Sequence, residues 1–538
     1  MCAWRIIRVA VTIPLGLMAY SGAYAGDLAT RALPMKSLVY CSEASPKGFD
    51  PNGYTSTPDY TVAAAVFNRL LEYNRTNINK IEPSLAERWV ISPDGRVYTF
   101  YLRRGVKFHT TPWFKPTRDF NAEDVVFTFE RMRNPDMPFR KAYPSEFPDF
   151  GNLETVISKI EAPDPYTVRF TLSSVYAPFL AQFGQPYASI ISAEYAQQLL
   201  EKGKPSEINQ KPVGTGPFIF RKYDKDSTLV FDGNPEYWKP RDVQLSKLIF
   251  SITPDAAVRA QKLIQNECQV NVYPRPSDVA KLRKVPHLQV LIQPGFNMTS
   301  LVYNARHQPL GDVRVRRALD MAINKKAIID AVYEGHAQVA VAPMSPRQWA
   351  YDKSLKDTPR DLKQARKLLA QAGYPDGFTL SLWAMSVQRP SNPNARLMAQ
   401  MIQADWEKIG IKAKIVTYEW GEFLARAYKG EHDALLIGWP GTGNDADEWL
   451  RSVLVFSHWR NKAFDDLRQK AQQTMDTVKR TQLYLKAQKV FKREQPLTPI
   501  AYATDYQVIN KRVTGFKINP LGPTIFSGVG FGTPVRTD

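Results

Sequence analysis

The N-terminal third of the chain contains two short segments in which hydrophobic and polar residues alternate on either side of a tight turn. Segments 86–91 and 97–102 flank Asp94-Gly95, and the second segment is rich in β-branched and aromatic residues. Asp tolerates unusual backbone angles, and Gly takes the positive φ that other residues avoid. Alternation of these residue types is typical of strands, so the pattern predicts a β-hairpin.

A helix is predicted shortly after this hairpin. Asn121 is a favoured N-cap residue, and Asp124 places a carboxylate on the first turn, where the helix dipole favours negative charge. The segment 125–132 then supplies the body of the helix.

Strand and helix patterns continue to alternate towards the C-terminus. Met398 and Ile402 fall on one helical face, and Gly410 provides a stop signal. Segment 411–418 and the apolar run 435–439 are predicted strands, the second of them buried. Alternation of this kind predicts an α/β protein that binds its ligand at the ends of strands.

The first 25 residues have the features of an export signal. Arg5 and Arg8 precede a mostly apolar stretch, and Ala23 and Ala25 place small residues at the two positions that a signal peptidase reads. The stretch is too short and too interrupted to span a membrane, and no later segment has about 20 uninterrupted apolar residues. We therefore expect a soluble, exported protein that is cleaved near Ala25.

The chain is strongly basic. It contains 71 Lys and Arg residues against 52 Asp and Glu residues, a formal net charge of +19. Loss of Arg5 and Arg8 with the signal lowers this charge to +17. The excess charge indicates either attraction to an anionic ligand or envelope surface, or a solvated basic coat with no single partner. Because the basic residues are scattered, nucleic acid is not an expected partner.

Several segments together resemble one known family. Residues 81–109 read IEPSLAERWVISPDGRVYTFYLRRGVKFH, and VGTGPF at 213–218 and DVRVRRALDMAINKKAIIDAVYEG at 312–335 follow in the order expected for that family. They are similar to the large peptide-type solute-binding proteins of bacterial ABC importers. The resemblance covers nearly all of residues 37–530 and is strongest to the dipeptide-binding members.

This resemblance implies a two-lobed periplasmic binding protein with a ligand cleft between α/β lobes. The first lobe would comprise residues 26–293 and 505–538, and the second residues 294–504. Hinge segments near 293–295 and 503–505 would absorb the change in backbone angles when the lobes close on a solute.

The resemblance also implies a function and partners. The protein would be a monomer that binds a dipeptide or related short peptide in the periplasm. It would deliver this ligand to the permease and ATPase of an ABC importer, and would need no cofactor.

Two cysteines remain after cleavage of the signal, Cys41 and Cys268, and they belong to no metal-binding motif. In an oxidising compartment such a pair favours a disulfide, and the matching positions are paired in the family. Two buried thiols are the alternative.

The carboxylate of a dipeptide requires a cation in an enclosing site, and its ammonium group requires an anion, because an unpaired buried charge is costly. In the family that the chain resembles, an arginine in a Val-Gln-Arg-Pro segment binds the carboxylate. This implies the same role for Arg389. Its planar, permanently charged guanidinium suits that role, and a surface salt bridge is the alternative.

The ammonium side of the expected site departs from the family. Gly438-Trp439 matches the strand end that precedes the family's aspartate, although simple packing would also explain this pair. The position of that aspartate holds Thr442, which supplies no charge. Asp445 and Asp447 are close enough in sequence to substitute for it, so the sequence leaves the ammonium anchor open.

The sequence contains no recognised catalytic motif: no G-x-S-x-G, no H-E-x-x-H and no phosphate-binding loop with its lysine. Residues 445–448 lack the Gly and the distant Glu of a calcium loop, so no metal is expected. A secreted hydrolase is the alternative from another class, but a catalytic acid pair is defined by its spacing in the fold rather than in the sequence. Within the binding proteins, a glutathione-like peptide, a longer peptide or haem remains an alternative ligand.

Overall fold

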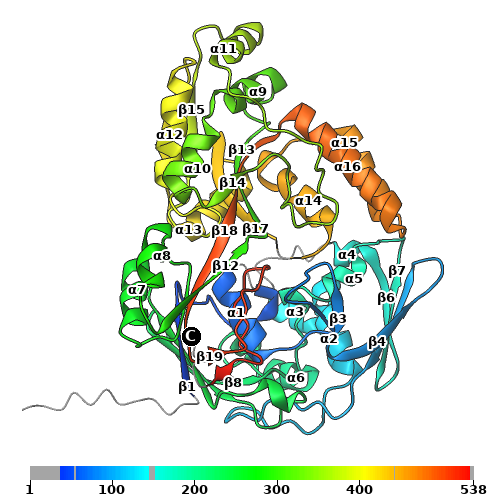
Figure 1. Ribbon diagram of the computed structural model, residues 1–538. Helices are drawn as coiled ribbons and strands as arrows, with labels where there is room; N and C mark the ends of the chain where they lie inside the picture. Colours follow the sequence, from blue (N-terminus) through cyan, green and yellow to red (C-terminus); the bar gives the residue numbers. More distant parts are fainter. Residues whose placement is uncertain (1–36, 54–55, 145–151, 442, 533–538) are drawn as a thin grey trace, which may run out of the picture. The chain divides into compact units, whose positions relative to one another are not determined.

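The computed structural model describes residues 37–53, 56–144, 152–441 and 443–532 (Figure 1). Its main feature is a 12-stranded mixed sheet in the order β16-β15-β17-β13-β18-β11-β1-β10-β9-β8, with β12 and β14 also paired to β18. These strands are β1 (Ser37–Ser42), β8 (Phe218–Asp224), β9 (Thr228–Gly233), β10 (Lys247–Ile252), β11 (Val270–Val272), β12 (Leu288–Pro294), β13 (Asn297–Tyr303), β14 (Ala337–Val339), β15 (Thr379–Ala384), β16 (Lys412–Val416), β17 (Ala434–Pro440) and β18 (Leu497–Asn510). The predicted α/β fold class is confirmed, and the predicted strands 411–418 and 435–439 correspond to β16 and β17.

Strand β18 lies in the middle of this sheet and joins its two halves. It is 14 residues long, and its first half pairs with β13 and β14 while its second half pairs with β12 and β11. Figure 1 shows it as one long arrow running past both groups of strands.

The two segments predicted as hinges are neighbours on β18. Gln293 pairs with Asp505 and Pro294 with Thr504. The backbone N–H of Gly295 donates to the Ala503 carbonyl at 3.1 Å. The chain therefore crosses twice at one place, and the lobe boundaries assigned to these crossings stay a prediction.

A four-stranded antiparallel sheet in the order β4-β5-β7-β6 lies in the N-terminal part, and two small two-stranded sheets complete the described strands. The strands of these sheets are β2 (Leu71–Tyr73), β3 (Ile81–Pro83), β4 (Ala86–Ile91), β5 (Val97–Leu102), β6 (Ile157–Asp164), β7 (Thr167–Leu172), β19 (Val513–Thr514) and β20 (Gly530–Phe531). The predicted hairpin is confirmed as β4 and β5, and Gly95 in its turn has a φ of +68°.

The helices cover the sheets and supply most of the remaining core. They are α1 (Thr57–Val66), α2 (Ala122–Arg133), α3 (Pro138–Ala142), α4 (Leu153–Val156), α5 (Phe179–Gln182), α6 (Ala193–Glu201), α7 (Ala256–Ile264), α8 (Pro276–Arg283), α9 (Val313–Ala322), α10 (Lys325–Tyr333), α11 (Leu362–Gln371), α12 (Ala395–Glu407), α13 (Trp420–Lys429), α14 (Ala446–Ser457), α15 (Lys462–Gln472) and α16 (Thr477–Glu494). The predicted cap is confirmed, since the Asn121 side chain accepts from the Glu123 amide, and α2 begins directly after it.

Buried side chains form three large clusters. One is built almost entirely by residues 296–503, and a second by residues 70–213. The third combines residues 38–272 with residues 509–529, so the C-terminal segment returns to pack with the N-terminal part. None of the described helices is long and apolar enough to cross a membrane. The predicted signal peptide lies outside the described residues.

The structure joins Cys41, on β1, to Cys268, just before β11, in a disulfide that closes a loop of 227 residues. Both sulfur atoms are fully buried. In the chain-entropy model a loop of this length stabilises the fold by at most about 5 kcal/mol.

Titration of thiols in the denatured, unreduced protein from residue 26 onward should find none, because both remaining cysteines are bonded to each other. Prior reduction should expose two. Two free thiols without reduction would show that the disulfide does not form.

Candidate functional site

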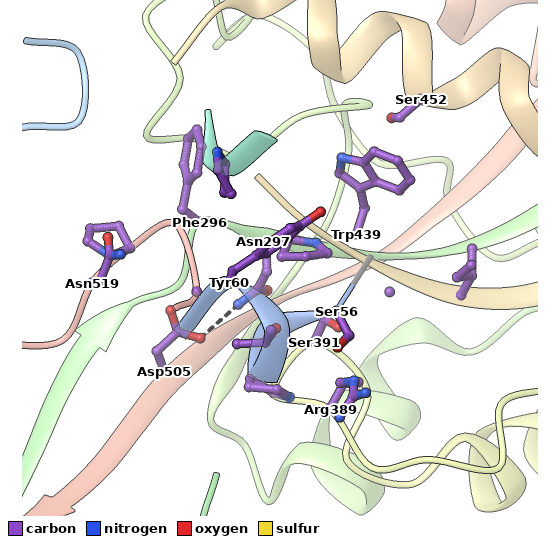
Figure 2. A pocket seen from close by; sticks show the side chains of 18 of the residues that line it. Ser56, Tyr60, Phe296, Asn297, Arg389, Ser391, Trp439, Ser452, Asp505 and Asn519 are labelled. Carbon is purple, nitrogen blue, oxygen red and sulfur yellow. Dashed lines mark hydrogen bonds between the residues drawn. The ribbon is translucent and has the colours of Figure 1, made fainter. Parts of the chain in front are cut away.

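A cavity of about 670 Å³ lies where the two halves of β18 meet. Its walls come from α1, β13, α13, β17, α14 and β18 and from the loops between them. The volume is in the range of sites that bind small molecules. Figure 2 shows Phe296, Trp439 and Arg389 among the side chains that surround it.

Most of the lining is apolar. The larger apolar side chains are Phe296, Trp420, Leu424, Ile437, Trp439 and Phe456. The indole N–H of Trp439 is buried and donates no hydrogen bond within the described part of the chain. A buried polar group is normally paired, so this N–H is a ready donor to a bound ligand.

Four charged side chains stand among the described lining residues: Arg389, Arg451, Glu448 and Asp505. Glu448 accepts a hydrogen bond from Gln185 Nε2 at 3.2 Å. Two basic and two acidic side chains in a mainly apolar cavity suit a ligand that carries both signs of charge, because each buried ligand charge can then have a partner.

Arg389 lies on the loop that follows β15, as the sequence predicts for a strand-end site. Its backbone exchanges hydrogen bonds with Asn392 at 3.0 and 3.2 Å, which fixes the loop. The guanidinium carbon lies 5.9 Å from the centre of the Trp420 ring. The side chain is 19% exposed, so its charge is available to the cavity but largely shielded from bulk water.

The nearest carboxylate to Arg389 is that of Glu43, with Nη1 to Oε1 at 3.9 Å. Glu43 follows β1 and is buried, and neither of its carboxylate oxygens accepts a hydrogen bond within the described residues. Arg389 therefore offsets a buried charge of the protein itself. A ligand carboxylate would have to share this arginine with Glu43.

Gly438 and Trp439 also line the cavity, on β17. A Cβ atom added at Gly438 would collide with the Ser391 hydroxyl, so this position requires glycine. The Ser391 carbonyl accepts a hydrogen bond from the Tyr333 hydroxyl at 2.6 Å, which holds the serine against β17. Ser391 was missed by the sequence analysis, and its place directly after Arg389-Pro390 was the available signal.

The two aspartates that could substitute for the ammonium anchor are not among the described residues that line the cavity. Asp445 caps α14 and pairs with Arg480, with Nη2 2.9 and 3.0 Å from its two oxygens. Asp447 pairs with Arg468 and accepts from Gln472. This placement argues against a ligand role for either aspartate, because each carboxylate is already neutralised by an arginine. Thr442 lies outside the described residues.

Asp505 on β18 was expected only as part of a hinge, yet it lines the cavity. Asn297 Nδ2 donates to Asp505 Oδ1 at 3.0 Å, the contact drawn as a dashed line in Figure 2. Burial raises the pKa of Asp505 to about 7, against the opposing effects of the Arg347 charge and the Asn297 hydrogen bond. No sequence pattern predicts this role, because the direction of a side chain on β18 depends on the register of its pairing with neighbouring strands.

Comparison with known proteins agrees with this geometry. A family model described as bacterial extracellular solute-binding proteins, family 5 Middle, matches residues 80–461. The di/tripeptide-binding protein 1 of Pseudomonas aeruginosa is 53% identical over 92% of this chain and 94% of its own. The heme-binding protein A of Haemophilus influenzae is 40% identical over 92% of both chains.

A solved structure shows the same fold. The dipeptide-binding protein of Pseudoalteromonas sp. SM9913, in complex with Met-Leu, superposes with a TM-score of 0.84 at 34% identity, over 92% of this chain and 100% of that one. The extent of these matches leaves one assignment: the chain belongs to family 5 of the bacterial extracellular solute-binding proteins.

Proposed function

We propose that this protein is the periplasmic binding component of an ABC importer and that its ligand is a dipeptide or similarly short peptide. The observation that carries the proposal is the cavity, which combines an apolar lining with two basic and two acidic side chains. A short peptide has the matching chemistry, since its side chains bury apolar surface while its two ends carry opposite charges.

Arg389 is the proposed anchor for the peptide carboxylate. It lies at the cavity wall with most of its surface shielded, so a bidentate contact with a carboxylate would be strengthened by the low local dielectric. Ser391 and Trp439 are placed to contribute hydrogen bonds, and Phe296 and Trp420 to contact ligand side chains.

The role in import rests on the family and on the export signal. We propose that residues 1–25 direct the chain to the periplasm and are removed near Ala25. The loaded protein then passes its ligand, chemically unchanged, to a permease and ATPase as a monomer. The two-lobe boundaries near 293 and 505 belong to the same proposal, since closure between lobes would retain the ligand.

Haem is the second candidate, because a 40% identical relative is a heme-binding protein. Among the described lining residues there is no histidine or cysteine, which leaves Met385 and tyrosines as iron ligands. The paired charges favour a peptide over haem, whose two propionates share one sign.

Mass spectrometry of small molecules released by denaturing the natively purified periplasmic protein tests the proposal. We expect short peptides, and after refolding we expect calorimetry to show one site for Met-Leu with micromolar or tighter affinity. Met-Leu should be recovered intact after prolonged incubation. A Soret band in the purified protein together with no heat of binding for Met-Leu would instead assign haem.

A further inference from the structure

The cavity contains one carboxylate whose place in the fold suits it to bind a cationic ligand group. Asp505 lies where β18 passes from its pairing with β13 and β14 to its pairing with β12 and β11. The Asp505 side chain is partly exposed, but only to the cavity that it lines. It is otherwise surrounded by protein.

The protein itself only partly compensates the charge of Asp505. Asn297 donates one hydrogen bond to it, and the same Asn297 is fixed in place by accepting from the Ala503 amide at 2.9 Å. Arg347 attracts the carboxylate by its charge, but its guanidinium Nη1 donates to the Pro294 carbonyl at 2.9 Å. A buried carboxylate with this incomplete compensation gains from a ligand cation.

The other acid of the cavity is more fully occupied. Glu448 accepts from Gln185, and Arg451 lies three residues further along α14, on the same side of the helix. A cationic group of the ligand is therefore accommodated best next to Asp505. In the view of Figure 2, Asp505 and Arg389 lie apart, with other lining side chains drawn between them.

We propose that Asp505 binds the ammonium group of the ligand, so that the site selects peptides with a free N-terminus and a carboxylate directed to Arg389. This inference rests on the proposed function, and it assigns to Asp505 the specificity of the peptide site for a free N-terminus. Since Asp505 lies on a crossing segment, the ligand ammonium would also contact the strand about which the lobes are proposed to move.

The groups around Asp505 determine how binding depends on pH. Facing it are Asn297 from β13, Gln293 from β12, Tyr273 after β11 and Arg347 after β14. Burial raises the pKa of Tyr273 far above the neutral range. His336 lies against the neighbouring Tyr506, with ring centroids 5.7 Å apart.

Calorimetry with Met-Leu and N-acetyl-Met-Leu tests the proposal. The wild type should prefer the free peptide by about 100-fold or more, as expected when a buried charge loses its partner. In Asp505→Asn this preference should collapse to a few-fold, because the amide keeps the shape and removes the charge. The same loss in Glu448→Gln, with Asp505→Asn unchanged, would overturn the proposal.

A pH series gives a second measurement that does not depend on the variant folding. If only ionised Asp505 binds the ammonium, affinity for Met-Leu should fall about 50-fold between pH 7 and pH 5, given a pKa of about 7 in the empty site. Asp505→Asn, where it folds, should lose most of this pH dependence. Equal wild-type affinity for the free and acetylated peptides would overturn the assignment of Asp505 while leaving a peptide-binding function intact. Binding of neither peptide would refute both.

Discussion

Replacing Arg389 with alanine is expected to weaken binding of Met-Leu by about 100-fold or more. The carboxylate of the ligand would then lie in an apolar cavity without its cation, and loss of one partner of a buried ion pair typically costs about 3–5 kcal/mol. Each 1.4 kcal/mol corresponds to a tenfold change in affinity, so the expected loss is between two and nearly four decades. The fold should persist with some loss of stability, because the Arg389 side chain is no part of a core cluster but its removal leaves the buried Glu43 carboxylate without its nearby cation.

Glu43 provides the matched control for this prediction. Its carboxylate lies 3.9 Å from Arg389 and competes with the ligand for the same guanidinium. Glu43→Gln removes this competitor at nearly constant shape, so it should leave Met-Leu binding unchanged or strengthen it. Arg389→Ala should therefore weaken binding, whereas Glu43→Gln should not.

Calorimetry of both variants at pH 7, with melting curves to check folding, measures the contrast. Arg389→Lys should recover only part of the affinity, because a lysine ammonium cannot make the two parallel hydrogen bonds of a guanidinium. Equal weakening by Arg389→Ala and Glu43→Gln would indicate that the pair is structural and that Arg451 binds the carboxylate instead.

The sequence predicted local structure well where local chemistry determines it. Strands β4 and β5 have the predicted limits, because the turn at Asp94-Gly95 and the alternation beside it fix the hairpin. Helix α2 begins at Ala122, directly after the predicted cap at Asn121, and carries Asp124 on its first turn as predicted.

A residue of the candidate site could be predicted only where the short segment around it is enough to identify it. Arg389 was identified from its own neighbours, and the structure places it at the cavity together with Gly438 and Trp439. Asp505 was not, because its side chain reaches the cavity through the long-range pairing of β18 with β12 and β13. For Asp445, closeness in sequence to Trp439 does not determine where the carboxylate points: a helix begins there, and the carboxylate is directed towards Arg480 on α16.

Because Asp445 pairs with Arg480 and does not line the cavity, we expect its substitution to affect stability rather than ligand binding. Asp445 and Arg480 are both more than nine-tenths buried, and Arg480 also donates to the Ala471 carbonyl and the Tyr484 hydroxyl. Asp445→Asn would leave the Arg480 charge buried and unpaired. We expect the free energy of unfolding to fall by about 3–5 kcal/mol, as for other buried pairs that lose one partner.

Urea unfolding followed by tryptophan fluorescence measures this loss, and Asp466→Asn is its matched control. Asp466 also pairs with a cation, Lys462 on the same helix, but the two side chains are 45% and 88% exposed, so its loss should cost at most about 0.5 kcal/mol. Affinity for Met-Leu should stay within a few-fold of the wild type in folded Asp445→Asn. We expect Asp445→Asn to lose stability and keep binding, and Arg389→Ala to keep its fold and lose binding. This contrast would separate the residues that hold α14 against α16 from those that hold the ligand. Wild-type stability with binding lost in Asp445→Asn would instead return Asp445 to the ligand site.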